Sequence, residues 1–239
     1  MSTATLVSCI VPVHDGERYL GETLDSIAGQ TYRPIEVVVV DDGSTDRSAA
    51  IAREHPAGVR CVSQAQAGHA AARNRGLAEA SGRFVAFLDA DDLWAPSKLA
   101  RQIGAFDARP ELGVVFTHLE SFLSPGVDAG QCNASELGRV IPGYTSVCLL
   151  ARRSVFDLVG RFDESLAHAN DRDWLCRAAE AGVVMEMLAD VLVRRRLHAD
   201  NRSHRLAAQS QAEYLRVLKR SLDRRRQAGG PAIKYPFGL

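Results

Sequence analysis

Two periodicities of apolar and polar positions alternate along the first half of the chain. Short runs rich in Val and Ile predict four strands, at residues 6–13, 35–42, 59–64 and 84–90. Helical spacing predicts a helix at 17–30, one after a cap at Ser44 or Thr45, and one at 70–82 that ends at Gly82. Strands that alternate with helices form parallel sheets, and near-continuous apolar strands need helices on both faces. The pattern therefore predicts an α/β fold around a mostly parallel central sheet.

The second half of the chain is less regular. Further strands are predicted at 113–120, 145–153, 183–188 and 191–198, and helices at 96–106, 171–182 and 204–226. Gly and Pro residues predict a loop at 121–139. No internal repeat divides the chain. We therefore expect one domain over residues 1–203, with a sheet that becomes mixed, followed by a basic helix and tail over 204–239.

Two of the predicted strands end in aspartates, at Asp41-Asp42 and at Asp89, Asp91 and Asp92. In open α/β sheets, ligands bind beyond the carboxyl ends of the strands, so both acidic ends should meet at one cleft. Because Ser44 or Thr45 can cap the following helix, the strand-end carboxylate is expected to be free for a base N–H or a ribose hydroxyl.

The sequence "FLDADDLW" concentrates three carboxylates within four residues, 89–92. Like charges so close raise one another's pKa unless a cation lies among them. Carboxylate oxygens suit Mg²⁺ or Mn²⁺, which complete their coordination with water and substrate phosphate. A metal bridging a diphosphate is one interpretation. The other is an acidic turn in which Asp92 caps the helix that starts near Pro96.

Composition limits the functional classes. Lys plus Arg and Asp plus Glu both total 29, and the pI of about 7.1 argues against a dedicated nucleic-acid binder. The five cysteines form no CxxC pair, which favours reduced, buried thiols. The N-terminal residues lack the features of a signal peptide, and no run of 18 apolar residues is present. We therefore expect a cytoplasmic location.

Three segments in order resemble the family-2 glycosyltransferases of the GT-A fold. They are "VSCIVPVHDGERYLGETLDSIAGQTYRPIEVVVVDDGSTD", "GHAAARNRGLAEASGRFVAFLDADDLWAPSKL" and "VGRFDESLAHANDRDWLCRAAEAG". The resemblance covers about residues 6–204. It implies a Rossmann-like half that binds a nucleotide sugar, at about 1–95, and an acceptor half at about 96–203.

The resemblance also implies donor and metal residues. The donor-binding positions that it suggests are Pro12, Asp42, Gly68, Arg73, Asn74, Asp89 and Ala90. Asp91 would ligate Mn²⁺ or Mg²⁺, Asp89 would meet the ribose or metal-bound water, and His198 would be a third metal contact. Two of these have simpler interpretations, because Arg73 can lie on a solvated helix face and His198 can be an ordinary surface histidine.

A catalytic base is implied by the family's acidic pair, usually Glu-Asp, at the start of a helix. Here the pair is Asn170-Asp171, so Asp171 takes the role of the base and Asn170 departs from the pattern. The simpler interpretation is that Asp171 caps the helix. A second departure is His14-Asp15, where an aromatic residue and Asn are commoner, and this affects the expected base contacts.

The predicted reaction is inverting transfer from a nucleotide-diphosphate sugar, a UDP-sugar first of all, to a hydroxyl of a glycan, lipid-linked or small-molecule acceptor. One alternative is a noncatalytic nucleotide-sugar binder. The other is a phosphohydrolase that uses Asp89 as its nucleophile.

The basic amphipathic segment 204–226 has two interpretations. It can lie on an anionic membrane at the inner face, as a peripheral contact, or pack its apolar side on the domain with its charges in water. The sequence leaves the oligomeric state open, and a homodimer is one of the states it allows.

Overall fold

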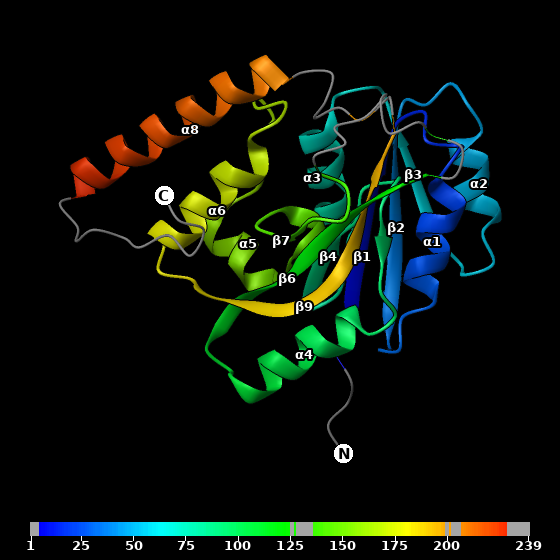
Figure 1. Ribbon diagram of the computed structural model, residues 1–239, viewed down its shortest axis with the longest axis horizontal. Coiled ribbons are helices and arrows are strands. Elements are labelled where there is room, and N and C mark those ends of the chain that lie inside the picture. Colours follow the sequence, from blue (N-terminus) through cyan, green and yellow to red (C-terminus); the bar gives the residue numbers. More distant parts are fainter. Residues whose placement is uncertain (1–4, 125–126, 128–135, 199–200, 202–206, 229–239) are drawn as a thin grey trace.

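The computed structural model describes residues 5–124, 127, 136–198, 201 and 207–228. A central mixed sheet has helices on both sides (Figure 1). The strands are β1 (Val7–Val13), β2 (Ile35–Asp42), β3 (Arg60–Gln64), β4 (Phe84–Phe87), β5 (Leu93–Trp94), β6 (Leu112–Leu123), β7 (Val140–Pro142), β8 (Leu150–Arg152) and β9 (Val184–Leu197). The helices are α1 (Leu20–Ala28), α2 (Ser48–Glu54), α3 (His69–Glu79), α4 (Lys98–Ala108), α5 (Arg153–Val159), α6 (Asn170–Glu180) and α8 (Ala207–Ala228), with a 3₁₀ turn, η3 (Ser146–Cys148).

The strand order is β3-β2-β1-β4-β8-β6-β9-β5, with β7 paired to β6. The first four strands are parallel, as predicted, and β8 then runs antiparallel to both β4 and β6. The parallel part contains the crossover helices, and it places the carboxyl ends of β1, β2 and β4 at one edge. The predicted mixed α/β architecture is confirmed.

Apolar side chains from both faces of the sheet are buried. One core joins β1 and β2 to α1, α2 and α4, and includes Leu24 and Leu99. The other joins the opposite face to α3, α5 and α6, and includes Phe87, Phe156 and Trp174. The near-continuous apolar strands therefore have the two-sided cover that their sequence predicts.

The second half departs from the predicted elements where strands pair over long distances. The two short strands expected at 183–188 and 191–198 form one strand, β9, whose irregular register against β6 absorbs the break. β6 extends to Leu123, inside the predicted loop, because its last residues pair with β9. The strand expected at 145–153 is instead η3, the short β8 and the first residue of α5. Most of the rest of the predicted loop lies outside the described residues.

Two predicted helix boundaries are wrong. Neither Ser44 nor Thr45 caps α2, because Ser44 Oγ accepts the backbone N–H of Asp15 and the Thr45 N–H donates to Asp15 Oδ1. Gly82 lies beyond the end of α3. A Cβ on Gly82 would lie 2.6 Å from Ser8 Oγ, so this glycine permits close approach to β1 rather than ending a helix.

The described cysteines are unpaired, and Cys61 is only partly buried, unlike the buried thiols that the sequence predicts. Cys9, Cys148 and Cys176 are buried, and burial raises the pKa of the Cys9 thiol to about 12 and that of Cys176 to about 11. Such thiols stay protonated at neutral pH and react slowly. Cys132 lies outside the described residues.

Helix α8 packs against α6 (Figure 1), with Glu213, Val217 and Ser221 buried at the contact. This agrees with the interpretation in which the helix packs on the domain. Residues 204–206 of the predicted helix lie outside the described residues. Among the residues that the structure describes, none of the helices combines the length and the apolar character needed to span a membrane.

Helix α3 approaches β1 through Gly76, and this contact gives the first prediction. A Cβ at Gly76 would overlap Cγ2 of buried Ile10. We expect Gly76→Ala to lower the free energy of unfolding by about 1–3 kcal/mol, because overpacking outweighs the better helix propensity of Ala. Urea denaturation followed by circular dichroism measures this change.

The matched control is Gly104→Ala, in the exposed part of α4, where an added Cβ meets no atom within 4 Å. There the same substitution should stabilise the protein by up to about 1 kcal/mol. Equal effects at both positions would contradict the packing argument.

Candidate active site

A cleft of about 1290 Å³ opens at the edge of the sheet where β1 and β2 end. Both acidic strand ends lie in it, as the sequence predicted. It also contains side chains from the loop before α6 and from α8, so it spans both halves of the chain. The predicted site residues that line it are Pro12, Asp42, Gly68, Arg73, Asp89, Ala90, Asp91, Asp171 and His198.

Asp42 is not free at the end of its strand, which corrects the expectation from the sequence. Its Oδ1 accepts hydrogen bonds from Gln64 Nε2 and the Ala67 N–H, and its Oδ2 accepts one from the Gly68 N–H, each at 2.8 Å. The side chain is nearly fully buried. These bonds fix the loop that leads into α3, where Gly68 has a φ of +97°. Asp42 therefore shapes the wall of the cleft through this loop.

Asn74 does not line the cleft, which corrects its expected place in the donor site. Its Nδ2 donates to Phe162 O at 2.9 Å and to Glu164 Oε1 at 2.8 Å, and its Oδ1 accepts the Phe162 N–H at 3.0 Å. Both the nitrogen and the oxygen of the buried amide thus form hydrogen bonds with the turn before α6. It holds α3 to the acceptor half of the chain.

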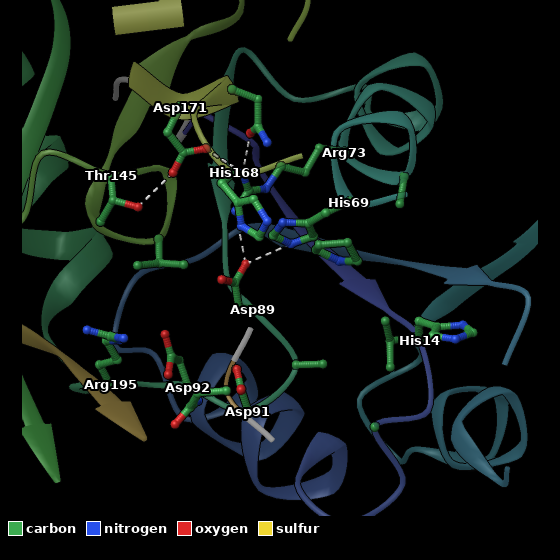
Figure 2. A pocket seen from close by; sticks show the side chains of 18 of the residues that line it. His14, His69, Arg73, Asp89, Asp91, Asp92, Thr145, His168, Asp171 and Arg195 are labelled. Atoms are coloured by element: carbon green, nitrogen blue, oxygen red, sulfur yellow. Dashed lines mark hydrogen bonds and ion pairs between the residues drawn. The ribbon is translucent and has the colours of Figure 1, made fainter. Parts of the chain in front are cut away.

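Arg73 is buried in the centre of the site, so the solvated-face interpretation is wrong. Its Nη1 donates to Asn170 Oδ1 at 3.0 Å and to Asp171 Oδ1, and its Nη2 donates to Asp89 Oδ1 at 3.0 Å. The guanidinium is 3% exposed. Figure 2 shows Asp89 and Asp171 on opposite sides of this group. One side chain therefore joins the acidic strand end to the start of α6.

Asp89 is held by two basic side chains. Besides Arg73, His69 Nε2 lies 3.1 Å from Asp89 Oδ1. Burial alone would raise the pKa of Asp89, but His69 and Arg73 together bring that pKa well below its usual range. Sequence reasoning did not identify His69. Its position directly after Gly68, at the first residue of α3, was the available signal.

Asp171 is the second residue of α6, and its carboxylate accepts several hydrogen bonds. Its Oδ2 accepts from the Thr145 hydroxyl at 2.7 Å, from the Ser146 N–H at 2.9 Å and from the Ser146 hydroxyl at 3.0 Å. Burial raises the pKa of Asp171, but Arg73 and the donors at Ser146 and Thr145 lower it below the ordinary value. The side chain serves no cap of its own helix. The capping interpretation is therefore wrong.

Asn170 takes the place of the acidic residue that the family usually has. It is buried, accepts from Arg73 and donates through Nδ2 to Leu166 O at 3.2 Å. Because Asp89 and Asp171 already balance the guanidinium, a neutral side chain here avoids a third buried negative charge. The departure from the pattern is thus accommodated within the ion-pair network.

Asp91 and His198 come together across 107 residues of sequence. Asp91 Oδ2 lies 2.9 Å from His198 Nε2, and both residues line the cleft. A carboxylate and an imidazole suit Mn²⁺, and Mg²⁺ or Mn²⁺ commonly takes few protein ligands beside water and phosphate. These two residues therefore fit a divalent cation. Asp89 faces His69 and Arg73, and its place at the ribose or at metal-bound water stays a prediction. Within the described residues, no group of three His, Cys, Asp or Glu side chains is placed to hold a metal.

Asp92 belongs to the sheet rather than to a helix cap. It is buried and accepts the backbone N–H of Arg196 at 2.9 Å, whereas α4 has no side-chain cap. Burial, Asp91 and Asp89 raise the pKa of Asp92 well above its usual value. Figure 2 shows Asp91 and Asp92 on the far side of Asp89 from Asp171.

Arg196 supports the acidic loop, and sequence reasoning did not identify it. Its Nε donates to Asp91 O at 2.8 Å, its Nη2 to Glu22 Oε2 at 2.6 Å and its Nη1 to Ser124 Oγ at 3.1 Å. The guanidinium is almost fully buried. An arginine two residues before His198 in a predicted strand was the available signal.

The other end of the cleft contains His14, at the second departure from the family pattern. Its Nδ1 lies 2.9 Å from Asp42 O, and its Nε2 lies 3.0 Å from Gln66 Nε2. Asp15 beside it has a φ of +49°. His14 is separated from Asp171 and Asp89 in Figure 2, so it belongs to the far part of the cleft.

Similar proteins were found by sequence and by structure. An uncharacterized glycosyltransferase of Nostoc sp. is 40% identical over 118 residues, which cover 48% of this chain and 36% of that protein. Staphylococcus aureus TarS 1–349, solved with UDP-GlcNAc, has a TM-score of 0.64 and 24% identity, covering 80% of this chain and 58% of TarS. A Pyrobaculum calidifontis mannosyltransferase, solved with GDP-Man and Mn²⁺, has a TM-score of 0.71 and 23% identity. The match covers 99% of this chain and 68% of the mannosyltransferase chain.

The two structural matches support the GT-A-type fold that the sequence predicted. The chain spans 32% to 64% of the lengths of the first curated relatives that it matches. The model of glycosyl transferase family 2 matches residues 8–159, which include β1 to β4, the acidic loop and α3. The chain therefore belongs to glycosyl transferase family 2.

Proposed function

We propose that this protein is a metal-dependent inverting glycosyltransferase. It moves a sugar from a nucleotide-diphosphate donor to an acceptor hydroxyl, and a UDP-sugar is the first candidate for the donor. One observation carries the proposal. Arg73 contacts Asp89 of the donor half and Asp171 of the acceptor half within one cleft. Groups of the kind needed to hold a leaving group and to remove a proton therefore lie on either side of one guanidinium.

The donor would lie along the cleft from His14 to Asp89. Pro12, Gly68 and Ala90 also line the cleft, and Asp42 fixes the loop that carries Gly68. The TarS structure contains UDP-GlcNAc and the mannosyltransferase structure contains GDP-Man, which supports a nucleotide-sugar donor here. Because Asp89 is ion-paired to both His69 and Arg73, it is a poor nucleophile, which disfavours the phosphohydrolase alternative.

Asp91 and His198 would hold Mn²⁺ or Mg²⁺ beside the donor diphosphate. The Mn²⁺ in the mannosyltransferase structure supports this choice. When bound, the cation would neutralise the negative charge that develops on the departing nucleoside diphosphate. Arg196 holds the backbone carbonyl of Asp91 and so keeps its carboxylate directed to the cleft.

Asp171 would remove the proton from the acceptor hydroxyl as its oxygen attacks the anomeric carbon on the face opposite the leaving group. Its lowered pKa keeps the carboxylate ionised at neutral pH. Thr145 and Ser146 fix Oδ2, while Arg73 holds Oδ1. The acceptor hydroxyl must replace or share one of these hydrogen bonds, and the Thr145 hydroxyl can turn away most easily because it rotates about a single bond.

Replacing the proposed base tests the reaction. We expect Asp171→Asn to lower transfer by about 10²–10⁴-fold, because the amide cannot accept the proton. Binding of the donor should remain, since the substitution keeps the size of the side chain. Transfer is measured by release of nucleoside diphosphate, and donor binding by calorimetry.

The matched control is Asp157→Asn, on the exposed side of α5 and outside the cleft, which should keep full activity. Full transfer by a correctly folded Asp171→Asn protein would refute the assignment of the base.

A panel of nucleotide sugars tests the donor and the metal together. We expect one UDP- or GDP-sugar with Mn²⁺ to raise the melting temperature by about 5–10 °C at a hundredfold excess over Kd. Chelation by EDTA, or the substitution Asp91→Asn, should remove most of this shift, whereas Asp157→Asn should keep it. A shift of equal size with and without metal would contradict metal-assisted binding.

A peripheral contact with the inner face of an anionic membrane is proposed for α8. Leu215 and Leu222 are 64% and 48% exposed, and exposed Lys219 and Arg226 lie on the same side of the helix at spacings of three and four residues. We expect co-sedimentation with vesicles that contain anionic lipid at low salt, with binding lost at high salt.

The variant Leu215→Gln/Leu222→Gln should lower this membrane binding severalfold, and neutral vesicles should bind neither protein. Failure of the unmodified protein to bind anionic vesicles at low salt would remove this part of the proposal.

A further inference from the structure

Helix α8 lies beyond the residues that match the family model, yet it reaches the cleft. Ser210 and Tyr214 line the same cleft as Asp171. Their spacing of four residues places both on one face of the helix. Leu215 lies on another, exposed face of α8. The residues that line the cleft are therefore separate from those of the membrane contact proposed above.

Glu213 fixes this helix to the segment that precedes α6. Its carboxylate accepts the backbone N–H groups of Ala167 at 3.2 Å, His168 at 2.8 Å and Ala169 at 3.1 Å. Helix α6 has no side-chain cap of its own, and a carboxylate at a helix N-terminus stabilises it. Of these three groups only the Ala169 N–H lies at the N-cap position of α6. Glu213 therefore fixes the backbone that leads into α6 and places a negative charge beside the start of that helix. It also holds the neighbouring Tyr214 close to the helix that carries Asp171.

Further contacts along α8 keep it in this position. Arg224 forms ion pairs with Glu180 at the other end of α6, at 2.6 Å, and the Ser221 hydroxyl donates to the same carboxylate. Val217 is fully buried against Cys176 of α6. The helix is thus anchored to α6 and the segment before it at four positions between residues 213 and 224, the stretch that includes Tyr214.

Tyr214 presents an aromatic side chain to the cleft. It is 40% exposed, and Arg172 Cζ lies 5.9 Å from the centre of its ring. Arg172 also lines the cleft and follows Asp171 directly in the first turn of α6. A sugar ring has an apolar C–H face, which packs on an aromatic ring, and a rim of hydroxyls, which accept from a guanidinium.

We propose that Tyr214 and Arg172 form an acceptor subsite between α6 and α8 that binds a saccharide, with the sugar ring packed on Tyr214. This inference rests on the proposed glycosyltransferase function, because it places the acceptor beside the proposed base. It also names the acceptor class, since the aromatic ring and the guanidinium complement a sugar better than they complement a simple alcohol.

Saturation-transfer NMR tests this subsite directly, with methyl β-glycosides of glucose, galactose and N-acetylglucosamine as probes. The full chain is used, with and without UDP and Mn²⁺. We expect saturation transfer from the protein to at least one glycoside. Tyr214→Ala should bind that glycoside about five- to tenfold more weakly, in line with the loss of one aromatic contact. Tyr214→Phe should bind as the unmodified protein does, because the ring remains.

The control variant is Gln211→Ala, which is exposed on α8 and lies outside the cleft lining. It should keep glycoside binding. If Tyr214→Ala does not fold, as judged by its melting curve, Tyr214→Leu replaces it, since Leu fills space but lacks the aromatic face. Absence of binding to every glycoside, or unchanged binding by the folded Tyr214 variant, would overturn the proposal.

The nucleotide-sugar thermal-shift panel, run on the same proteins, separates the two hypotheses. Loss of glycoside binding with an intact donor shift supports the subsite and the proposed function together. An intact donor shift with no glycoside bound by the unmodified protein overturns the subsite alone. Absence of any donor shift counts against the proposed function itself.

Discussion

The ion pairs of Arg73 are the interaction on which the rest of the site depends. A buried guanidinium is stable only when its charge is matched, and here Asp89 and Asp171 match it from opposite sides. Gly76, three residues further along α3, lets the helix approach β1 closely enough to place the arginine between them. Since both carboxylates have lowered pKa values, the stability that they contribute is fully present above the ordinary carboxyl range. It is lost as the pH falls toward their folded-state values.

Local patterns were sufficient to predict the first half of the fold. Strand positions followed from apolar runs, and the rule that ligands bind beyond carboxyl ends placed Asp42 and Asp89 in one cleft. Resemblance to the family supplied the pairing of Asp91 with His198 and the position of Asp171, which no local pattern contains. The structure brings these residues into that cleft, while their catalytic and metal-binding roles remain proposals.

The errors have a common physical origin in partners that are distant in sequence. Arg73 contacts Asp171 across 98 residues, and Asn74 contacts Phe162 across 88, so the surroundings of "ARN" could not be inferred from its own helix. The carboxylate of Asp42 is used by a loop about 25 residues later. In each case a polar side chain that looked available for a ligand was needed to satisfy buried backbone or charged groups. The cap of α2 was predicted wrongly for the same reason, because Ser44 and Thr45 form hydrogen bonds with Asp15 instead.

The carboxylate of Glu213 can bind the segment before α6 only once α8 has been synthesised. A chain is synthesised from its N-terminus, and its early segments can begin to fold first. The parallel strands and α3 can therefore assemble while α8 is still untranslated. At that stage the three N–H groups at 167–169 lack the carboxylate that fixes them in the folded protein. The donor side of the cleft thus precedes the acceptor side during biosynthesis, and Asp171 reaches its final geometry only after α8 has been synthesised.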